Sequence, residues 1–592
     1  MLVLDWLAPG CGRAQCLTSA QVTTLTNNWN TWQSNQDNVI QTWGNVGMPA
    51  NNYFAGQFRN DFDFGVATYG NNSNAVTNLN YGVNSRWPDL LNFVSPSGTG
   101  KNGSHGYALH SQEGGGEYGR YSLNYYALPL ASSALLGRDM WTETTAFKSG
   151  VFQTIYNTMP TISTSRSMWD MFTWGDDENW QAGAGCGYQS HNGPDGHGGC
   201  GASSQYYGDF MQAAANEFPG TAVGKLARQW ISTVNPAIGP IHKSVDPGGS
   251  SQAYSTMPLD YYSSGAQYMY SRSDWTASGT SMLWQMGLYN GDNVLSVPWG
   301  GGHSHQDAGT FQAFRKGVPI IRETMAYSET VAGYNGVGTA DAATGFAHNI
   351  PFIGGQASIN VFGGCSDGPG IVKRLETQPN YSFVVTDLTL TYKNTVCDSG
   401  HPERQNPYVV SVVREYYYLR GINTLVIVDR LQTDVATRST TFVSHCETTP
   451  TVSSATVACI DGTQEALYTA LAPAAPTIAV VTENANGANA ANWQYRIEAN
   501  NANPGNVVSY NIYTIQLGDA SGFSALTPGV VDSSPGNPSS GTFTITLDAN
   551  DSLVINKGIA SSGGTIKVAG STNALATTVQ GMTITDGGPA WQ

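Results

Sequence analysis

Charged side chains are scarce in this sequence: of its 592 residues only 11% are Asp, Glu, Lys or Arg. Basic residues are the rarer kind, because 26 Lys and Arg stand against 42 Asp and Glu and leave a formal net charge of −16. Nucleic acids and heavily sulfated polyanions bind to dense basic surfaces. The composition therefore argues against both as main partners, although a few Arg residues would suffice to hold a polyanion locally.

Long apolar runs are also missing, since no stretch approaches the roughly 18 apolar residues of a membrane-spanning helix. We therefore expect no membrane span. The eight cysteines are even in number and fall into close sequence neighbours, which suggests disulfides and an oxidising compartment. We expect a secreted or periplasmic protein. The neighbouring cysteines are Cys11 with Cys16, Cys186 with Cys200, Cys365 with Cys397, and Cys446 with Cys459.

The first part of the chain has the apolar spacing of amphipathic helices. Val22, Leu25 and Trp29 recur at helical intervals, and either Thr18 or Ser19 is placed to cap the N-terminus of that helix. Further helical stretches are expected at 123–137, 145–158 and 208–232. We expect a helical domain over residues 1–255.

The pattern changes to that of strands in the second part of the chain. Residues 408–418 are rich in Val and Tyr, a turn follows at Arg420-Gly421, and 424–431 is apolar again, which predicts a hairpin. Short Thr- and Val-rich stretches continue to the C-terminus, as in an all-β sandwich.

The expected fold class is therefore α+β and multidomain, with the helical domain followed by a large antiparallel β-sandwich domain over 256–592. A separate small β subdomain from about residue 480 is left open. Long Gly- and Asn-rich stretches at 95–118 and 181–206 exceed plain connections and are candidate walls of a site.

The segment 300–310 carries the strongest chemical signal. A glycine run precedes His303, His305 and Asp307, which stand at alternate positions. In an extended segment this spacing puts all three side chains on one face, where they would hold a metal ion, transfer a proton, or do both. The alternative is a surface loop with two solvated histidines.

Several short motifs accompany this segment in a fixed order between about residue 50 and residue 360. The motifs are Glu113-Gly114 followed by Tyr118 and Tyr121, Phe172-Thr173-Trp174-Gly175-Asp176-Asp177, Arg272-Ser273-Asp274-Trp275, His303-Ser304-His305-Gln306-Asp307-Ala308-Gly309, Gly317-Val318-Pro319-Ile320-Ile321-Arg322-Glu323, and Ala347-His348-Asn349. Together they resemble the heparinase II/III-type polysaccharide lyases. The resemblance implies that the helical domain is an incomplete (α/α) toroid packed with β-sandwich layers.

The resemblance also implies cleavage of a uronate polysaccharide by β-elimination, in which the C5 proton is removed and the C4 oxygen is expelled. Asn, His or Arg donors that neutralise the uronate carboxylate stabilise the enolate-like transition state. A base must lie within about 3 Å of the proton, and Tyr serves as acid or base once its surroundings lower its pKa. The reaction needs no organic cofactor.

Catalytic roles carry over by motif position. The family motif places its catalytic tyrosine five positions after Glu113, which is Tyr118 here, and Tyr121 is the nearby rival. His303 matches the first histidine of the family pair, which acts as base or carboxylate neutraliser. His110 lies just before Glu113 and is expected to line the site.

The family's carboxylate-binding Asn is less well located. Asn60 lies at about the right distance before Tyr118, while Asn51 and Asn52 compete for the role. Two acidic residues after Gly175 would shape sugar subsites or simply cap a helix. The residues expected to bind substrate are Glu113, Tyr121, Arg272, Trp174, Asp176 and Arg59.

His305, Glu323 and His348 match the positions that hold zinc in some members of the family. Two imidazoles and a carboxylate are a suitable zinc shell, although Glu323 replaces the usual Asp and is one methylene longer. We expect one divalent metal ion with a structural role, and Asp307 would orient one of the histidines.

The function expected is a lyase acting on an acidic polysaccharide, with a lightly sulfated uronan favoured over heparin because Lys is scarce. Two alternatives stay open. A glycoside hydrolase on the same scaffold would use a carboxylate pair, Glu113 with Asp176 or Asp177. A non-catalytic glycan-binding protein would keep the fold alone. Neither the oligomeric state nor an endo or exo action is predicted.

Overall fold

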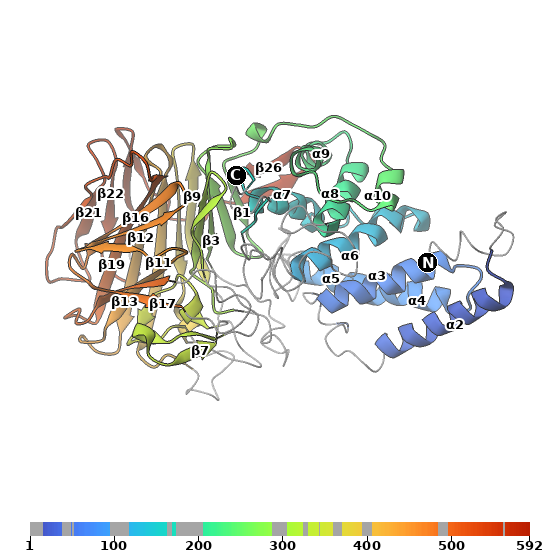
Figure 1. Cartoon of the computed structure of the whole chain (residues 1–592), viewed down its shortest axis with the longest axis horizontal. Helices are drawn as coiled ribbons and strands as arrows, with labels where there is room; N and C mark the ends of the chain where they lie inside the picture. The colour runs from blue at the N-terminus through green and yellow to red at the C-terminus, as the bar shows by residue number, and fades with distance from the viewer. Residues whose placement is uncertain are drawn as a thin grey trace.

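The computed structural model describes residues 16–37, 46, 49, 52–94, 118–162, 169–172, 205–286, 305–323, 330–341, 344–358, 370–393, 405–483, 495–560 and 563–592. Helices occupy the N-terminal side of the molecule, and antiparallel sheets occupy the other side (Figure 1). The predicted fold class is confirmed. The first strand begins at Asp260, close to the predicted domain boundary.

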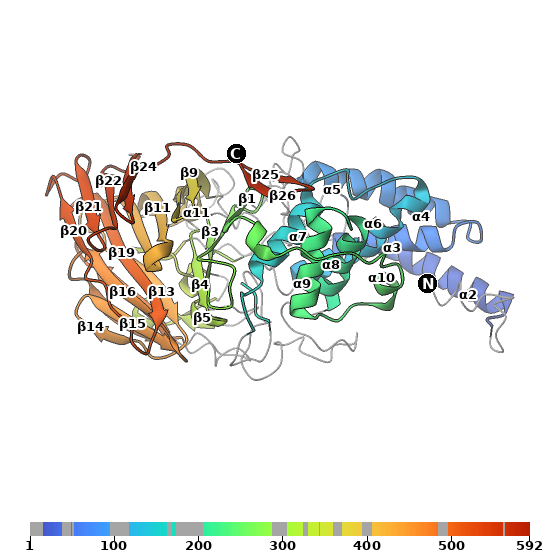
Figure 2. The same cartoon turned by 90° about the horizontal axis from the view of Figure 1, so that it is seen from above.

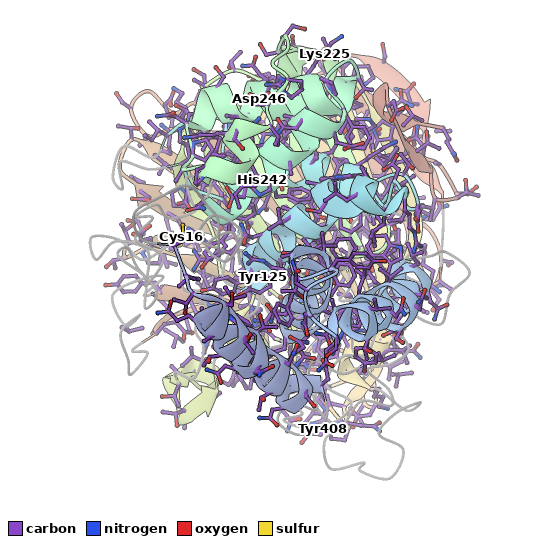
Figure 3. All side chains as sticks on the ribbon, turned by 90° about the vertical axis from the view of Figure 1, so that its right-hand side faces the viewer. Cys16, Tyr125, Lys225, His242, Asp246 and Tyr408 are labelled. Atoms are coloured by element: carbon purple, nitrogen blue, oxygen red, sulfur yellow. A yellow bond between two sulfur atoms is a disulfide. The ribbon has the colours of Figure 1, made fainter. Side chains whose placement is uncertain are left out.

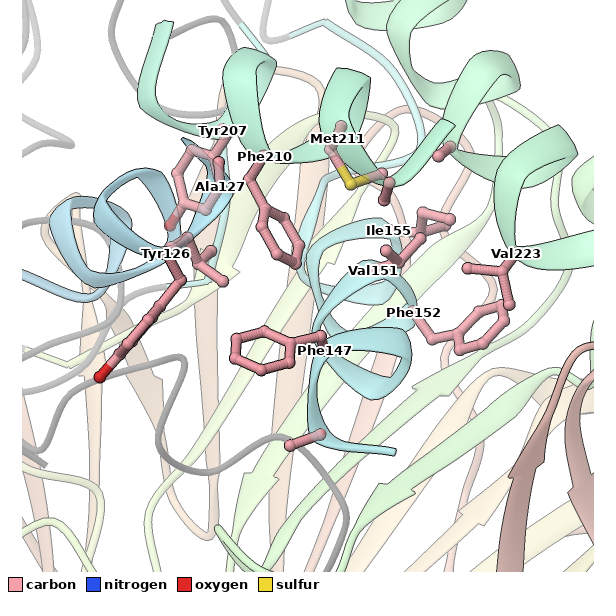
Figure 4. Close-up of a cluster of buried hydrophobic side chains, with 14 of the residues drawn as sticks. Tyr126, Ala127, Phe147, Val151, Phe152, Ile155, Tyr207, Phe210, Met211 and Val223 are labelled. Atoms are coloured by element: carbon pink, nitrogen blue, oxygen red, sulfur yellow. The ribbon is translucent and has the colours of Figure 1, made fainter. Parts of the chain in front are cut away.

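The helical domain packs around a core of aromatic side chains. Phe147 contacts the rings of Trp87 and Tyr126 at centroid distances of 5.9 and 5.6 Å, and Figure 4 shows it below Phe210 and beside Tyr126. The helices are α2 Ser19–Asn35, α3 Asn52–Ala67, α4 Ala75–Tyr81, the π-helix Gly82–Arg86, α5 Trp87–Val94, α6 Tyr118–Ser132, the 3-10 turn Ser133–Leu136, α7 Ala146–Asn157, α8 Gln205–Glu217, α9 Ala222–Val234, α10 Pro240–Ser244 and the 3-10 turn Tyr254–Thr256.

Local sequence signals explain several helix ends. Thr18, rather than Ser19, caps α2, because its hydroxyl accepts the Gln21 N–H and the Gln21 side chain accepts the Thr18 N–H. Gly137 ends the stretch that follows α6 in the left-handed conformation, at φ 67°. The helical stretch expected over 208–232 is two helices, because Thr221 caps the N-terminus of α9 after a turn.

The β domain is layered. The sheet β1–β5 lies next to the helices, the eight-stranded sheet follows it, and β20–β24 lies farthest away (Figures 1 and 2). The first sheet is β1 Asp260–Ser263, β2 Tyr268–Arg272, β3 Thr280–Gln285, β4 Phe311–Arg315 and β5 Val318–Ile321. The eight-stranded sheet, in spatial order, is β14 Thr451–Ser453, β15 Thr456–Asp461, β16 Gln464–Ala472, β19 Val508–Asp519, β12 Thr424–Thr433, β11 Val409–Leu419, β10 Tyr381–Asp387 and β9 Ile371–Gln378.

Smaller sheets complete this domain. A four-stranded sheet has the order β17 Thr477–Thr482, β18 Tyr495–Asn501, β13 Thr440–Cys446 and β8 Phe352–Ile353. The outer sheet is β20 Gly529–Asp532, β21 Thr542–Thr546, β22 Ser552–Asn556, β23 Gly564–Val568 and β24 Ser571–Ala574, and two hairpins are β6 Thr330–Ala332 with β7 Thr339–Asp341 and β25 Met582–Thr585 with β26 Gly588–Trp591. After residue 480, β17 and β18 belong to the four-stranded sheet and β19 to the eight-stranded sheet, and the outer sheet begins at Gly529.

The predicted hairpin is confirmed as β11 and β12, which pair in antiparallel register from Val409 opposite Thr433 to Leu419 opposite Thr424. The expectation of disulfides is confirmed by the bond between Cys446 and Cys459, and Cys16 is also disulfide-bonded. The other five cysteines lie outside the described residues. No helix in the described ranges is long and apolar enough to cross a membrane.

The C-terminal hairpin β25–β26 returns to the helical domain, as Figure 2 shows. The Ala222 N–H donates to the Asp586 carbonyl at 2.9 Å, and the Lys148 ammonium lies 2.6 Å from the Asp586 carboxylate. The end of the chain therefore fastens the β domain to α7 and α9.

Candidate functional site

The segment that follows His303 is buried and tightly held. His305 is 1% exposed and Asp307 is fully buried. Gly309 has φ +97°, a conformation that favours glycine. Its carbonyl accepts hydrogen bonds from Arg414 Nη1 at 2.8 Å and from the Tyr416 hydroxyl at 2.5 Å. The chain is therefore fixed in place just before β4 begins.

The structure brings the three predicted metal ligands together. Glu323 stands two residues after β5, and His348 follows the 3-10 turn Gly345–Ala347. His348 Nδ1 lies 2.9 Å from Glu323 Oε2, and the rings of His305 and His348 have centroids 5.3 Å apart. Thr310 Oγ1 donates to Glu323 Oε2 at 2.6 Å, and Gln312 Nε2 donates to Oε1 at 3.3 Å.

Burial dominates the electrostatics of this cluster. It raises the pKa of Glu323 to about 8, and the Thr310 hydrogen bond and the nearby histidines offset only part of that rise. Burial also lowers the pKa of His348 well below its usual value, and His305 adds to this effect. A neutral His348 that donates from Nδ1 to Glu323 keeps Nε2 as an acceptor. This Nε2 atom is buried, and none of the residues that the structure describes forms a hydrogen bond with it.

The arrangement does not form a ready metal shell. Across the described ranges, no group of three or more His, Cys, Asp or Glu side chains could hold a metal ion as it stands. The Glu323 carboxylate is instead occupied by hydrogen bonds from Thr310, Gln312 and His348. The donor types of these three residues suit zinc, and a zinc ion held by them stays a prediction.

Sequence reasoning missed a second layer of polar residues around this cluster. His445 on β13 donates from Nδ1 to Asn349 Oδ1 at 2.8 Å, and its Nε2 lies 3.8 Å from Glu483 Oε1. Arg496 on β18 pairs with both Glu483 and Glu498. The signal available in the sequence was a histidine within the stretch Thr440–Cys446, whose Thr, Phe and Val residues favour a strand.

Arg496 also reaches the segment that leads to His348. Its guanidinium donates to the backbone carbonyls of Ala332, Gly333 and Phe346 at 2.8 to 3.0 Å. Because the side chain is fully buried, these bonds tie the β6–β7 hairpin and the 3-10 turn before His348 to the four-stranded sheet.

On the helical side, Tyr118 is the first residue of α6 and Tyr121 stands one turn later. Asn60 and Arg59 lie on α3, where both are half-buried. The Arg59 guanidinium lies over the Tyr125 ring at 5.6 Å, and Tyr125 stacks with Tyr121 at 6.2 Å. Arg59 on α3 and Tyr121 on α6, both predicted to bind substrate, therefore contact the same Tyr125 ring.

Arg272 lies elsewhere. It is 2% exposed at the end of β2, and its Nη2 donates to the carbonyls of Ile155, Tyr156 and Thr158 at 3.2, 3.1 and 2.5 Å. These hydrogen bonds join the C-terminal end of α7 to the first sheet. They do not support the predicted contact of Arg272 with substrate. The predicted residues His303, His110, Glu113, Trp174, Asp176 and Asp177 lie outside the described residues.

Comparison with known proteins gives a relation at the level of the fold. No family model matches the sequence, and no curated protein sequence matches it. Solved structures do match. Heparinase III aligns at a TM-score of 0.58 and 13% identity over 97% of this chain and 73% of its own. The heparan sulfate lyase HepC from Pedobacter heparinus aligns at 0.54 and 12% identity over 93% of this chain and 72% of its own. This chain shares their fold. Such low identity carries no residue-level assignment.

Proposed function

We propose that this protein is an exported polysaccharide lyase that cleaves a uronate-containing glycan by β-elimination. The supporting observation is the fold shared with heparinase III along 97% of the chain. Fold likeness alone does not assign chemistry, so the proposal also rests on the motif residues that the resemblance identified. Heparan sulfate, the substrate named for the HepC lyase, is a uronate polymer, which matches the chemistry proposed.

In the proposed reaction a base removes the C5 proton, and the electron pair of that bond forms the C4–C5 double bond. The C4–O bond then breaks, and an acid protonates the leaving oxygen. Tyr118 and His303 are the proposed acid–base groups, Asn60 is the proposed carboxylate donor, and His110 lines the site. The buried segment from His305 to Gly309 supports this proposal, because it anchors the backbone directly after His303.

The predicted zinc ion is a separate proposal. It is checked by elemental analysis of the purified chain and of His305→Ala. One equivalent of zinc that is lost in the variant would support a metal role for His305, Glu323 and His348. If the purified protein contained no zinc and a chelator left its thermal stability unchanged, the hydrogen bonds around Glu323 would hold the cluster together without a metal ion.

The lyase proposal is tested by ultraviolet absorbance of the unsaturated uronate, with alginate, hyaluronan, glucuronan and heparan sulfate as substrates. We expect activity on at least one of them and a loss of about 10²- to 10⁴-fold in Tyr118→Phe and in His303→Ala, the usual range for removing a general acid or base. Tyr69→Phe is the control, since Tyr69 is 66% exposed beyond the end of α3.

Two results would contradict the proposal. New reducing ends without the unsaturated product would indicate hydrolysis by a carboxylate pair. Full lyase activity in both Tyr118→Phe and His303→Ala would remove the proposed acid–base groups.

A further inference from the structure

Tyrosines recur along one face of α6. Positions 118, 121 and 125 are related as i, i+3 and i+7, and residues with this spacing lie in line on one side of a helix. At a rise of about 1.5 Å per residue, position 125 stands roughly 10 Å along the helix from position 118. A row of aromatic residues thus leads away from the proposed catalytic tyrosine.

Neighbouring helices extend this row into a patch that we call the Tyr–Arg face. Tyr206 on α8 meets the Tyr121 ring edge-on at a centroid distance of 4.8 Å. Arg120 lies over the rings of Tyr121 and Tyr206 at 5.1 and 5.4 Å. The Tyr–Arg face consists of Tyr53, Arg59, Tyr121, Tyr125 and Tyr206. Arg120 packs against the rings of Tyr121 and Tyr206 and is buried.

Part of this face is open to solvent. Tyr53 is 44% exposed, the Arg59 side chain is 38% exposed, and Tyr121, Tyr125 and Tyr206 are half-buried. Arg120 is only 4% exposed, so its guanidinium is buried against the tyrosine rings. Figure 3 views the helical domain from its end and shows Tyr125 near the middle of the domain.

Among the residues that the structure describes, Arg59 forms one ion pair. Its partner is Asp63, whose Oδ2 lies 3.6 Å from Arg59 Nε, a long contact for an ion pair. Burial raises the pKa of Asp63 to about 7, so this carboxyl group is partly protonated near neutral pH.

We propose that the Tyr–Arg face binds successive sugar units of an unsulfated or lightly sulfated polyuronate, next to the position that is cleaved. The inference rests on the proposed function. Pyranose rings present apolar C–H faces that pack on tyrosine rings, and a guanidinium pairs with a carboxylate through directed hydrogen bonds. Uronate units carry both features, and a neutral glucan carries only the first.

The charge of the face favours few sulfates. A heavily sulfated chain presents several anionic groups per disaccharide and needs a dense basic surface. The Tyr–Arg face contains two guanidinium groups. That of Arg59 is partly exposed, and that of Arg120 is buried against the rings. Polyglucuronate and alginate fit this supply of charge better than heparin does.

The test measures binding in the Tyr118→Phe background, so that ligand is not consumed. Affinity electrophoresis against polyglucuronate, alginate, heparin and dextran compares Tyr125→Ala, Arg59→Gln and the control Tyr69→Ala, which removes a tyrosine from outside the face. We expect each face variant to weaken polyuronate binding about tenfold, the effect of losing one good contact. Tyr69→Ala should bind like the background, and Arg59→Gln should leave dextran retardation unchanged.

The design separates this inference from the proposed function. Lyase activity together with unaltered polyuronate binding in both Tyr125→Ala and Arg59→Gln would overturn the Tyr–Arg face and leave the lyase standing. Weakened binding in an enzyme without activity on any uronan would support the face and contradict the lyase. If Tyr125→Ala fails to fold, the partly exposed Arg59 still decides the question, with Arg59→Lys expected to restore part of the affinity. Tighter binding of heparin than of polyglucuronate would refute the assigned substrate class.

Discussion

Replacing Asp429 by Asn would keep the size of the side chain and remove the charge that Arg414 faces across strands β11 and β12. The two residues are direct cross-strand neighbours. Arg414 Nε and Nη2 donate to the two carboxylate oxygens at 2.6 and 2.9 Å, and both side chains are fully buried. Arg414 Nη1 also binds the carbonyls of Gly309 and Asn349 at 2.8 and 2.5 Å, beside the Glu323 cluster.

The variant would leave the buried Arg414 guanidinium without its counter-charge. The amide NH2 group of the new side chain would also face an N–H donor of Arg414. Breaking a buried pair in this way costs about 3–5 kcal/mol. The chain offers a matched control in Arg438 and Asp434, which form the same two-point contact at 2.9 and 2.8 Å. That pair is 26% and 35% exposed, so Asp434→Asn should cost at most about 1 kcal/mol.

Urea unfolding of the full chain, followed by tryptophan fluorescence, measures both effects. Trp284 stacks on Tyr416 at 5.6 Å and reports on the layer that contains Arg414. The expected result is a much larger loss of unfolding free energy in Asp429→Asn than in Asp434→Asn. Equal losses in the two variants would refute the reasoning that burial sets the cost.

Two further predictions concern single positions. The pKa of Asp63 is raised from 3.8 to about 7 by burial, so the neutral form favours the fold, and this contribution is present at low pH and lost as the pH rises toward 7. Between pH 4 and 7 the midpoint of unfolding should fall less steeply in Asp63→Asn than in the unaltered protein. An unchanged slope would contradict the raised pKa of Asp63. A Cβ at Gly309 would overlap Leu388, at φ +97°, so Gly309→Ala should lower stability by about 1–3 kcal/mol. Gly70→Ala, at φ +84° with open space around it, supplies the backbone cost alone, and equal losses of stability would show that the overlap costs nothing.

Local signals in the sequence predicted much of the secondary structure. The cap at Thr18 or Ser19 and the turn at Arg420-Gly421 are read from a few neighbouring residues, because caps and turns depend on chemistry within one or two turns of chain. The break between α8 and α9 was missed, although Pro219-Gly220 is a turn signal and Thr221 is a residue type that caps helices.

The cluster around Glu323 was predictable only in part. Motif position pointed to His305, Glu323 and His348, and the structure places these three side chains together. His445 and Glu483 escaped because they reach the cluster through strand pairing across about a hundred residues. No spacing rule covers such a distance, and burial of charge is invisible in the sequence.

The C-terminal hairpin has a consequence for the order in which the molecule is made. The hydrogen bond from Ala222 to Asp586 joins positions 364 residues apart. At the usual rate of synthesis, α9 leaves the ribosome about 20–70 s before its partner does. During that interval the helices exist without the strap that will hold them to the β domain, so the bond between the two domains is among the last parts of the fold to form.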